Sequence, residues 1–94
     1  MNLPQSVMNS ISGLARQCNL DRVILFGSRA RGDNRERSDI DLAIQGGDTV
    51  AFAVSADEDI STLLMFDVVD LDKPVQSELL EEIRKDGVVI YEKV

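Results

Sequence analysis

The sequence predicts an α+β domain in which helices cover one face of a small four-stranded mixed β-sheet. Segments with apolar residues at helical spacing alternate with short runs rich in Val, Ile, Leu and Phe. Their order is helix, strand, strand, helix, strand, helix, strand. The 94 residues, of which 44% are hydrophobic, suffice for one domain with a real core, and we expect it to span residues 1–94.

The first third of the chain contains the first helix and the first strand. Apolar residues recur at helical spacing over residues 4–18, and Pro4 is suited to a first helical turn. Residues 22–26 form a short apolar run that stops at Gly27, as a buried strand does. Residues 28–38 have almost no large apolar side chain, so we expect a loop or a short exposed turn there.

The next segment contains a strand and an ambiguous element. Residues 39–45 alternate polar and apolar side chains before a Gly-Gly pair, which predicts a second strand beside the first. Asp48 or Thr49 can cap a helix that runs to about residue 63. The apolar residues at the start of this helix also alternate as in a strand, so both interpretations stay open.

The last third contains a strand, a helix and a strand. Residues 66–71 are an apolar run typical of a third strand. Apolar side chains at helical spacing predict a helix over residues 75–86, with Gly87 just past its end. Residues 88–91 close the chain as a fourth strand.

The composition argues against several classes of function. The net charge is −7 and aromatic residues are only 4%, so we expect no direct contact with nucleic acid and no affinity for anionic membranes. The chain has no histidine, which excludes His-based triads and imidazole zinc sites. Any bound metal ion must therefore be held by oxygen atoms.

The cysteine content and the hydropathy of the chain indicate in which cellular compartment the protein is expected. Cys18 is the only cysteine, and its helical spacing with apolar neighbours favours a buried thiol. No apolar run approaches the length of a membrane span, and the N-terminus has no basic stretch followed by an apolar one. We expect a soluble, unprocessed protein of the reducing cytoplasm.

Charge is distributed unevenly along the chain. Residues 1–37 have a net charge of +3, whereas residues 38–94 have −10. Four arginines lie in the predicted loop, at positions 29, 31, 35 and 37. A local anion-binding surface can therefore exist on an acidic protein, although the last two of these arginines are typical of a solvated loop.

Two short motifs flank this loop and carry the candidate chemistry. Asp39 and Asp41 are two residues apart on a predicted strand, so both carboxylates face the same side of the sheet. Adjacent carboxylates repel unless a cation lies between them, and Mg²⁺ prefers such oxygen ligands together with substrate phosphates. Gly27 allows the backbone to approach a phosphate, and Ser28 can donate hydrogen bonds to it.

Further residues extend the candidate site. Arg29 or Arg31 could complete an anion clamp. Asp67 lies in an apolar run that looks buried, where a charge is costly unless it is paired or bound to metal, so we expect it to be a third carboxylate of the site. Asp70 lies three residues on and faces the opposite side of the strand. The alternative for all three aspartates is a solvated or ion-paired sheet edge.

These motifs resemble the signature of the DNA polymerase β-like nucleotidyltransferase superfamily, in its minimal, single-domain MntA-like branch. The resemblance rests on Gly-Ser-Arg-Ala-Arg-Gly at residues 27–32 and Ser-Asp-Ile-Asp-Leu at residues 38–42. The spacing between the two motifs matches the signature without insertion. The resemblance continues through residues 67–71 and 83–91 and covers most of the chain from Arg22 onward.

The resemblance implies a specific set of roles. Gly27 and Ser28 would bind the triphosphate of ATP, Asp39 and Asp41 would hold two Mg²⁺ ions, and Asp67 would help to activate the nucleophile. Minimal members are typically antitoxins that transfer AMP to a tyrosine of a HEPN-domain ribonuclease toxin, with which a hetero-oligomer is expected. Larger relatives have an additional domain that grips the base and the acceptor, so the resemblance implies that the partner supplies part of the site.

Two other functions use the same residues. A non-catalytic antitoxin would silence its partner by binding alone. A nucleotidyltransferase could instead act on an RNA end or on a small molecule, although the negative charge weakens the RNA version.

Overall fold

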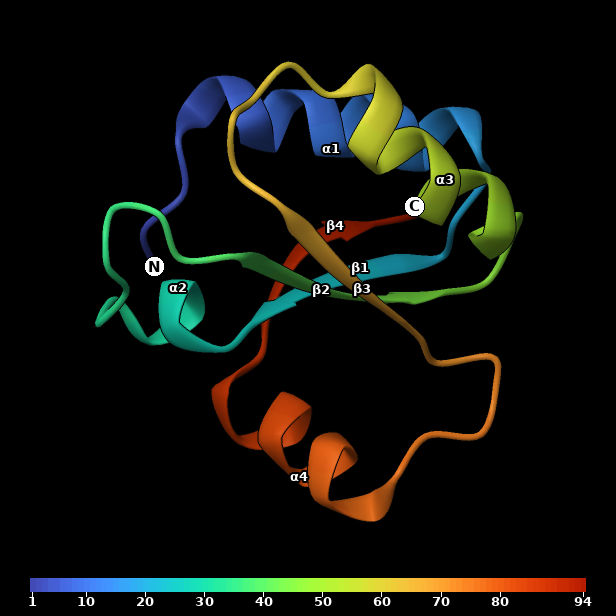
Figure 1. Ribbon diagram of the computed structural model, residues 1–94. Helices are drawn as coiled ribbons and strands as arrows, with labels where there is room; N and C mark the ends of the chain where they lie inside the picture. The colour runs from blue at the N-terminus through green and yellow to red at the C-terminus, as the bar shows by residue number, and fades with distance from the viewer.

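The computed structural model describes residues 1–94 and contains a four-stranded mixed sheet (Figure 1). The strand order is β3-β2-β1-β4, where β1 is Arg22–Phe26, β2 is Ile40–Gln45, β3 is Phe66–Asp70 and β4 is Val88–Glu92. β1 pairs antiparallel with both β2 and β4, and β2 pairs parallel with β3. The predicted α+β class with a mixed four-stranded sheet is therefore confirmed.

Helices cover both faces of this sheet. α1 (Gln5–Gln17) and α3 (Thr49–Asp59) lie on one side, and α4 (Ser77–Asp86) lies on the other (Figure 1). The expectation of a single covered face was wrong. β1 has apolar side chains on both faces, so Val23 and Leu25 join the larger core while Ile24 and Phe26 pack on the α4 side.

The core is divided unequally between the two faces. The cluster beneath α1 and α3 contains 14 buried residues, whereas the cluster beneath α4 contains three, Phe26, Ala43 and Ile83. α4 therefore rests on a small apolar contact. Polar residues of α4 next to this contact therefore lie close to the sheet.

The ambiguous segment after β2 is a helix. The Asp48 side chain accepts a hydrogen bond from the Ala51 backbone N–H at 3.1 Å and caps α3. Phe52 and Ala56 are fully buried at the i, i+4 spacing of a helix, which decides against a strand. The helix ends at Asp59, before the predicted residue 63, because Ile60 adopts an extended conformation.

The predicted loop begins with a short helix. α2 (Ser28–Arg31) is a single turn between Gly27 and Gly32, both of which have positive φ angles. Residues 33–39 then return the chain to β2.

Cys18 is half-buried and packs against the larger core. Burial raises the pKa of its thiol, and the charge of Asp48 contributes to a smaller extent.

Candidate active site

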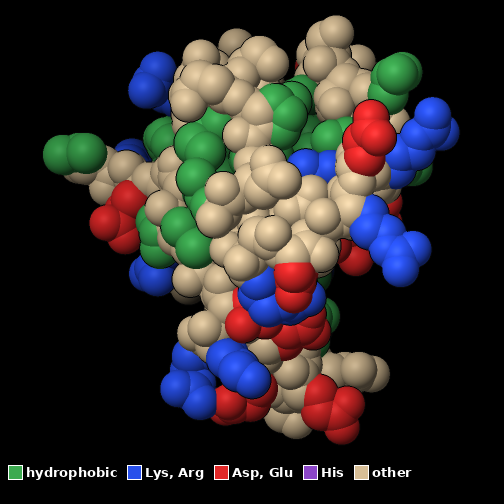
Figure 2. All heavy atoms as spheres, turned by 90° about the vertical axis from the view of Figure 1, so that its left-hand side faces the viewer, with side chains coloured by type: hydrophobic (Ala, Val, Ile, Leu, Met, Phe, Trp, Pro, Cys, Tyr) green, Lys and Arg blue, Asp and Glu red, His purple; other side chains and the backbone are tan.

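The candidate residues meet at one edge of the sheet. β1 runs antiparallel to β2 and pairs Phe26 with Asp41, so the end of β1 lies beside the start of β2. β2 and β3 are parallel and pair Asp41 with Asp67. This topology brings the Gly27-Ser28 turn next to the acidic residues of two strands. Figure 2 looks onto the molecule from this side.

Gly27 contacts the Asp41 carboxylate directly. Its φ is +74°, and a Cβ atom at this position would collide with the Asp41 Oδ2 atom. A side chain is therefore disfavoured both by the backbone conformation and by the lack of space. The glycine lets the turn after β1 close onto the carboxylate, and this close approach is what builds the site.

Asp41 lies in an electrostatically unfavourable place. The pKa of its carboxyl is raised to about 6, chiefly by burial and in addition by the charges of Asp67, Asp39 and Glu82. Arg31 acts in the opposite direction. Without a cation, three acidic neighbours and partial burial disfavour the ionised form of Asp41. Such clusters are characteristic of functional sites.

Asp67 and Asp70 lie on opposite faces of β3, as predicted. Asp70 accepts a hydrogen bond from the Thr49 hydroxyl at 2.7 Å and from the Asp72 backbone N–H at 2.9 Å, so it links β3 to α3 and to the following turn. Asp67 lies on the Asp41 side. The expectation that its surroundings are buried was wrong, because β3 is an edge strand and the Asp67 side chain is exposed.

Arg29 is placed differently from the expected anion clamp. It is only 3% exposed, and its guanidinium donates to the backbone carbonyls of Asn2, Glu36 and Ser38 at 3.0–3.2 Å. These contacts fix the loop that leads into Asp39. Arg29 lies in a segment with almost no large apolar side chain, so the sequence gave no signal of this burial.

Arg31 remains at the site edge. It makes ion pairs with Asp33 at 3.1 Å and with Asp86 of α4 at 2.9 Å. These contacts raise the pKa of its guanidinium, so it stays charged. Its charge is close enough to act on Asp41.

Glu82 is a site neighbour that the sequence did not reveal. It lies on α4, one residue before the buried Ile83. Helical spacing identified the apolar stripe of α4 but could not show over which strand this stripe packs. Only the docking of α4 on the second face of the sheet brings Glu82 near Asp41.

The donor set fits a hard divalent cation. Asp39, Asp41 and Asp67 offer only carboxylate oxygens, which suit Mg²⁺ when phosphates and water complete its coordination. No three acidic or cysteine side chains converge tightly enough to enclose an ion by themselves. Protein sites for Mg²⁺ commonly use one or two carboxylates, so the arrangement is compatible with an ion shared with a nucleotide.

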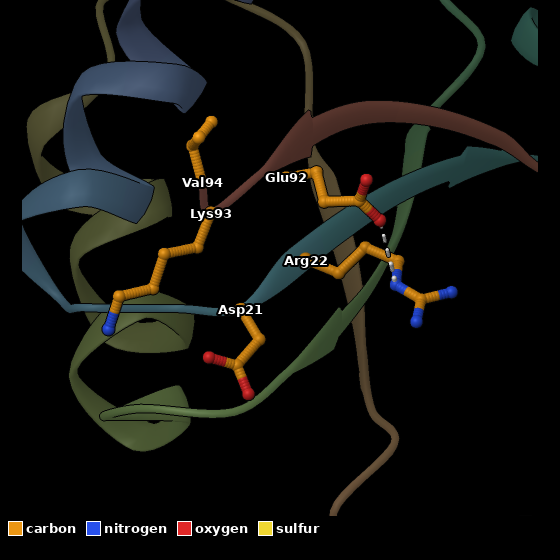
Figure 3. Close-up of a pocket in the computed structure, with 5 residues that line it drawn as sticks. All are labelled: Asp21, Arg22, Glu92, Lys93 and Val94. Atoms are coloured by element: carbon orange, nitrogen blue, oxygen red, sulfur yellow. Dashed lines mark ion pairs between the residues drawn. The ribbon is translucent and has the colours of Figure 1, made fainter.

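Two surface pockets lie at different distances from the candidate site. Figure 3 shows a shallow polar pocket at the start of β1, which is the opposite end of that strand from Gly27; it is lined by Asp21, Arg22, Glu92, Lys93 and Val94. A groove of about 580 Å³ lies closer to the site and is lined by Glu36, Arg37, Leu63, Leu64 and Met65. Leu63 is fully exposed and Met65 is largely exposed, so this groove offers apolar surface. None of the helices has the length and hydrophobicity that crossing a bilayer requires.

Several solved structures that are similar to this chain are toxin–antitoxin proteins. A variant of an MntA–HpeT toxin–antitoxin matches with 25% identity and a TM-score of 0.69, over 98% of this chain and 75% of that chain. A toxin–antitoxin crystallised with AMP-PNP matches with 25% identity and a TM-score of 0.67, over 92% and 73% of the two chains. An MntA–HepT toxin–antitoxin matches with 23% identity and a TM-score of 0.67, over 96% and 74%, and shows the fold alone.

No curated protein matches the sequence. The profile of the family described as polymerase beta nucleotidyltransferase, by contrast, matches residues 9–94, which is nearly the whole chain. The sheet, the two motifs at its edge and this match agree. The chain belongs to the polymerase β nucleotidyltransferase family and is a minimal nucleotidyltransferase of that superfamily.

Proposed function

We propose that this chain is an antitoxin and a Mg²⁺-dependent protein adenylyltransferase that transfers AMP from ATP to a tyrosine of a HEPN-domain ribonuclease toxin. One observation carries the proposal: the carboxylates of two neighbouring strands meet beside the Gly27-Ser28 turn, in a chain of the nucleotidyltransferase family. The similarity to toxin–antitoxin structures, one of them with AMP-PNP, supports the choice of partner and nucleotide.

Each residue has a chemical task in this proposal. Gly27 and Ser28 face the triphosphate, because the first N–H groups of α2 have no acceptor within the helix. Asp39 and Asp41 would hold the Mg²⁺ ions together with Asp67, and bound Mg²⁺ would supply charge neutralisation at the phosphates. Arg29 acts by positioning the loop before Asp39.

The transfer itself is a substitution at the α-phosphorus. The tyrosine oxygen forms a bond to this phosphorus while the bond to the pyrophosphate oxygen breaks. The exposed Asp67 carboxylate accepts the hydrogen bond of the tyrosine hydroxyl and takes its proton, which then passes to solvent. The products are AMP-tyrosine on the partner and pyrophosphate.

The test is transfer to the purified partner encoded beside this chain. Partner, ATP and Mg²⁺ are incubated with the wild type, with Asp39→Asn, with Asp41→Asn and with Asp57→Asn as a matched control at an exposed acid outside the site. Intact-mass spectrometry should show added AMP with the wild type and control. We expect each site variant to reduce the rate by about 100-fold or more.

The same experiment separates the binding-only antitoxin from the enzyme. The exposed Leu63 and Met65 beside the site give a specific reason to test this second function, because they offer apolar surface to a partner. A stable complex that silences the toxin without any mass increase would contradict the transferase and establish occlusion. Undiminished labelling by the aspartate variants would contradict the proposed site.

A further inference from the structure

Arg31 connects the turn after β1 to the helix on the far side of the sheet. Its backbone N–H donates to the Gly27 carbonyl at 3.2 Å, which places it within the turn. Its Nη1 atom lies 2.9 Å from the Asp86 Oδ2 atom, and Asp86 is the last residue of α4. Figure 2 shows positive and negative side chains intermingled where the α4 lobe meets the rest of the molecule.

The two carboxylates that contact Arg31 are not equivalent. The Asp86 side chain is 15% exposed, whereas that of Asp33 is 62% exposed. A solvated pair contributes little, so Asp33 restrains Arg31 only weakly. Asp86 is held by a helix and largely shielded from water, and it is therefore the residue that fixes the guanidinium.

The way in which Arg31 is held leaves one edge of the guanidinium free. Asp33 accepts a hydrogen bond from the Nε atom and Asp86 accepts one from the Nη1 atom, while Nη2 makes no hydrogen bond within the protein. A guanidinium fixed on two sides presents its remaining N–H groups in a defined direction. Such an edge suits the oxygens of a phosphate.

We propose that Asp86 is a positioning residue that holds Arg31 in place to bind the triphosphate of ATP. This inference rests on the proposed nucleotidyl transfer and adds a residue from α4, outside both sequence motifs. Because Asp86 acts through Arg31, its loss weakens binding of the nucleotide and leaves the chemical step largely unchanged. α4 thereby becomes part of the nucleotide site as well as a cover for the sheet.

The test compares Asp86→Asn with wild type in nucleotide binding and in transfer. We expect the Kd of Mg·ATP from calorimetry and the KM for ATP to rise by about 10-fold, and kcat to change by less than about 2-fold. Asp33→Asn should have a clearly smaller effect. Asp86→Glu should restore part of the affinity, because it retains the carboxylate.

Two controls separate positioning from stability. Glu81→Gln breaks the exposed Glu81–Arg84 pair of α4, at 2.7 Å, and should leave Kd and KM unchanged. Asp86 acts on the nucleotide only through Arg31. The double variant Asp86→Asn with Arg31→Ala should therefore lose no more affinity than Arg31→Ala alone.

The outcomes distinguish this inference from the proposed function. An unchanged Kd and KM in Asp86→Asn, with or without a lower melting temperature, would refute positioning and leave transfer intact. A wild type that binds ATP without labelling any partner would refute the transferase, while a weaker Kd in Asp86→Asn would still support the role of Asp86.

Discussion

The Asp41 carboxylate is half-buried beside the carboxylates of Asp39 and Asp67, and its pKa is raised to about 6. Its ordinary value is 3.8, so between these two values the folded protein binds more protons at this group than the unfolded chain does. Stability from this group therefore falls as the pH rises from about 4 to about 6. Above that range the ionised carboxylate destabilises the fold.

Replacing Asp41 with asparagine should relieve this repulsion. We expect Asp41→Asn to raise the free energy of unfolding at pH 7 by about 1 kcal/mol, a value reduced for solvent screening of the half-exposed group. The gain should shrink as the pH falls and vanish below about pH 3, where the wild-type carboxyl is protonated in both states. Urea unfolding of both proteins at several pH values, without divalent ions, measures this difference in the free energy of unfolding. An equal difference at pH 4 and pH 7 would contradict the electrostatic cause.

Glycine is the only residue type that fits at position 27. A Cβ atom would meet the Asp41 carboxylate, and the positive φ already disfavours a side chain. The sequence could mark this glycine as the end of a strand, but it could not identify the group that approaches it. Pairing of β1 with β2 supplies that group.

At the scale of elements, α3 is unfavourably charged at its end. Acidic residues 57–59 are exposed at its C-terminus, and no basic residue lies in its last turn. The C-terminal end of a helix has a partial negative charge, which these side chains repel. The helix is stabilised instead by the Asp48 cap and by the buried Phe52.

Reversing one of these charges should stabilise the protein. We expect Asp59→Lys to raise the free energy of unfolding by about 0.5 kcal/mol, and less at high salt. Glu78→Lys in the first turn of α4 is the matched control and should have the opposite sign, because that end of a helix favours acids. Chemical denaturation of both variants tests the prediction, and a shift of the same sign in both would contradict it.

Most elements could be predicted because their signals are local. The strand over residues 22–26 has the predicted bounds, and α1 and α4 differ from prediction by one or two residues at their ends. The apolar period, and the glycines that follow β1, β2 and α4, are properties of the chain itself. The structure of residues 28–38 was harder to predict, because the turn of α2 depends on contacts that Arg29 makes with distant carbonyls.

At the scale of the molecule, the two faces of the sheet differ in core size. The face beneath α1 and α3 is stabilised by a cluster of 14 buried residues, whereas Ile83 is the only buried residue of α4. Opening of α4 should therefore require less free energy than opening of the opposite face. The helix that carries Asp86 and Glu82 is the less firmly held part of the fold.

Truncating Ile83 should test this difference. We expect Ile83→Ala to lower the free energy of unfolding by about 2–3 kcal/mol and to accelerate hydrogen exchange in α4 more than in α1. Leu80→Ala on the same helix is the control, since Leu80 is 44% exposed and should change stability by less than about 0.5 kcal/mol. Equal acceleration of exchange in both helices would show that the two faces open together.

The sequence by itself determined the order of the elements, the two motifs and the placement of Asp67 and Asp70 on opposite faces of their strand. These features follow from local periodicity and from residue spacing, which the chain carries before it folds. Only the tertiary structure decided the strand order, the position of α4 on the second face, the burial of Arg29 and the contact between Asp86 and Arg31. These features depend on which segments pack together over long sequence separations, and alternation along a strand fixes its faces without fixing its neighbours.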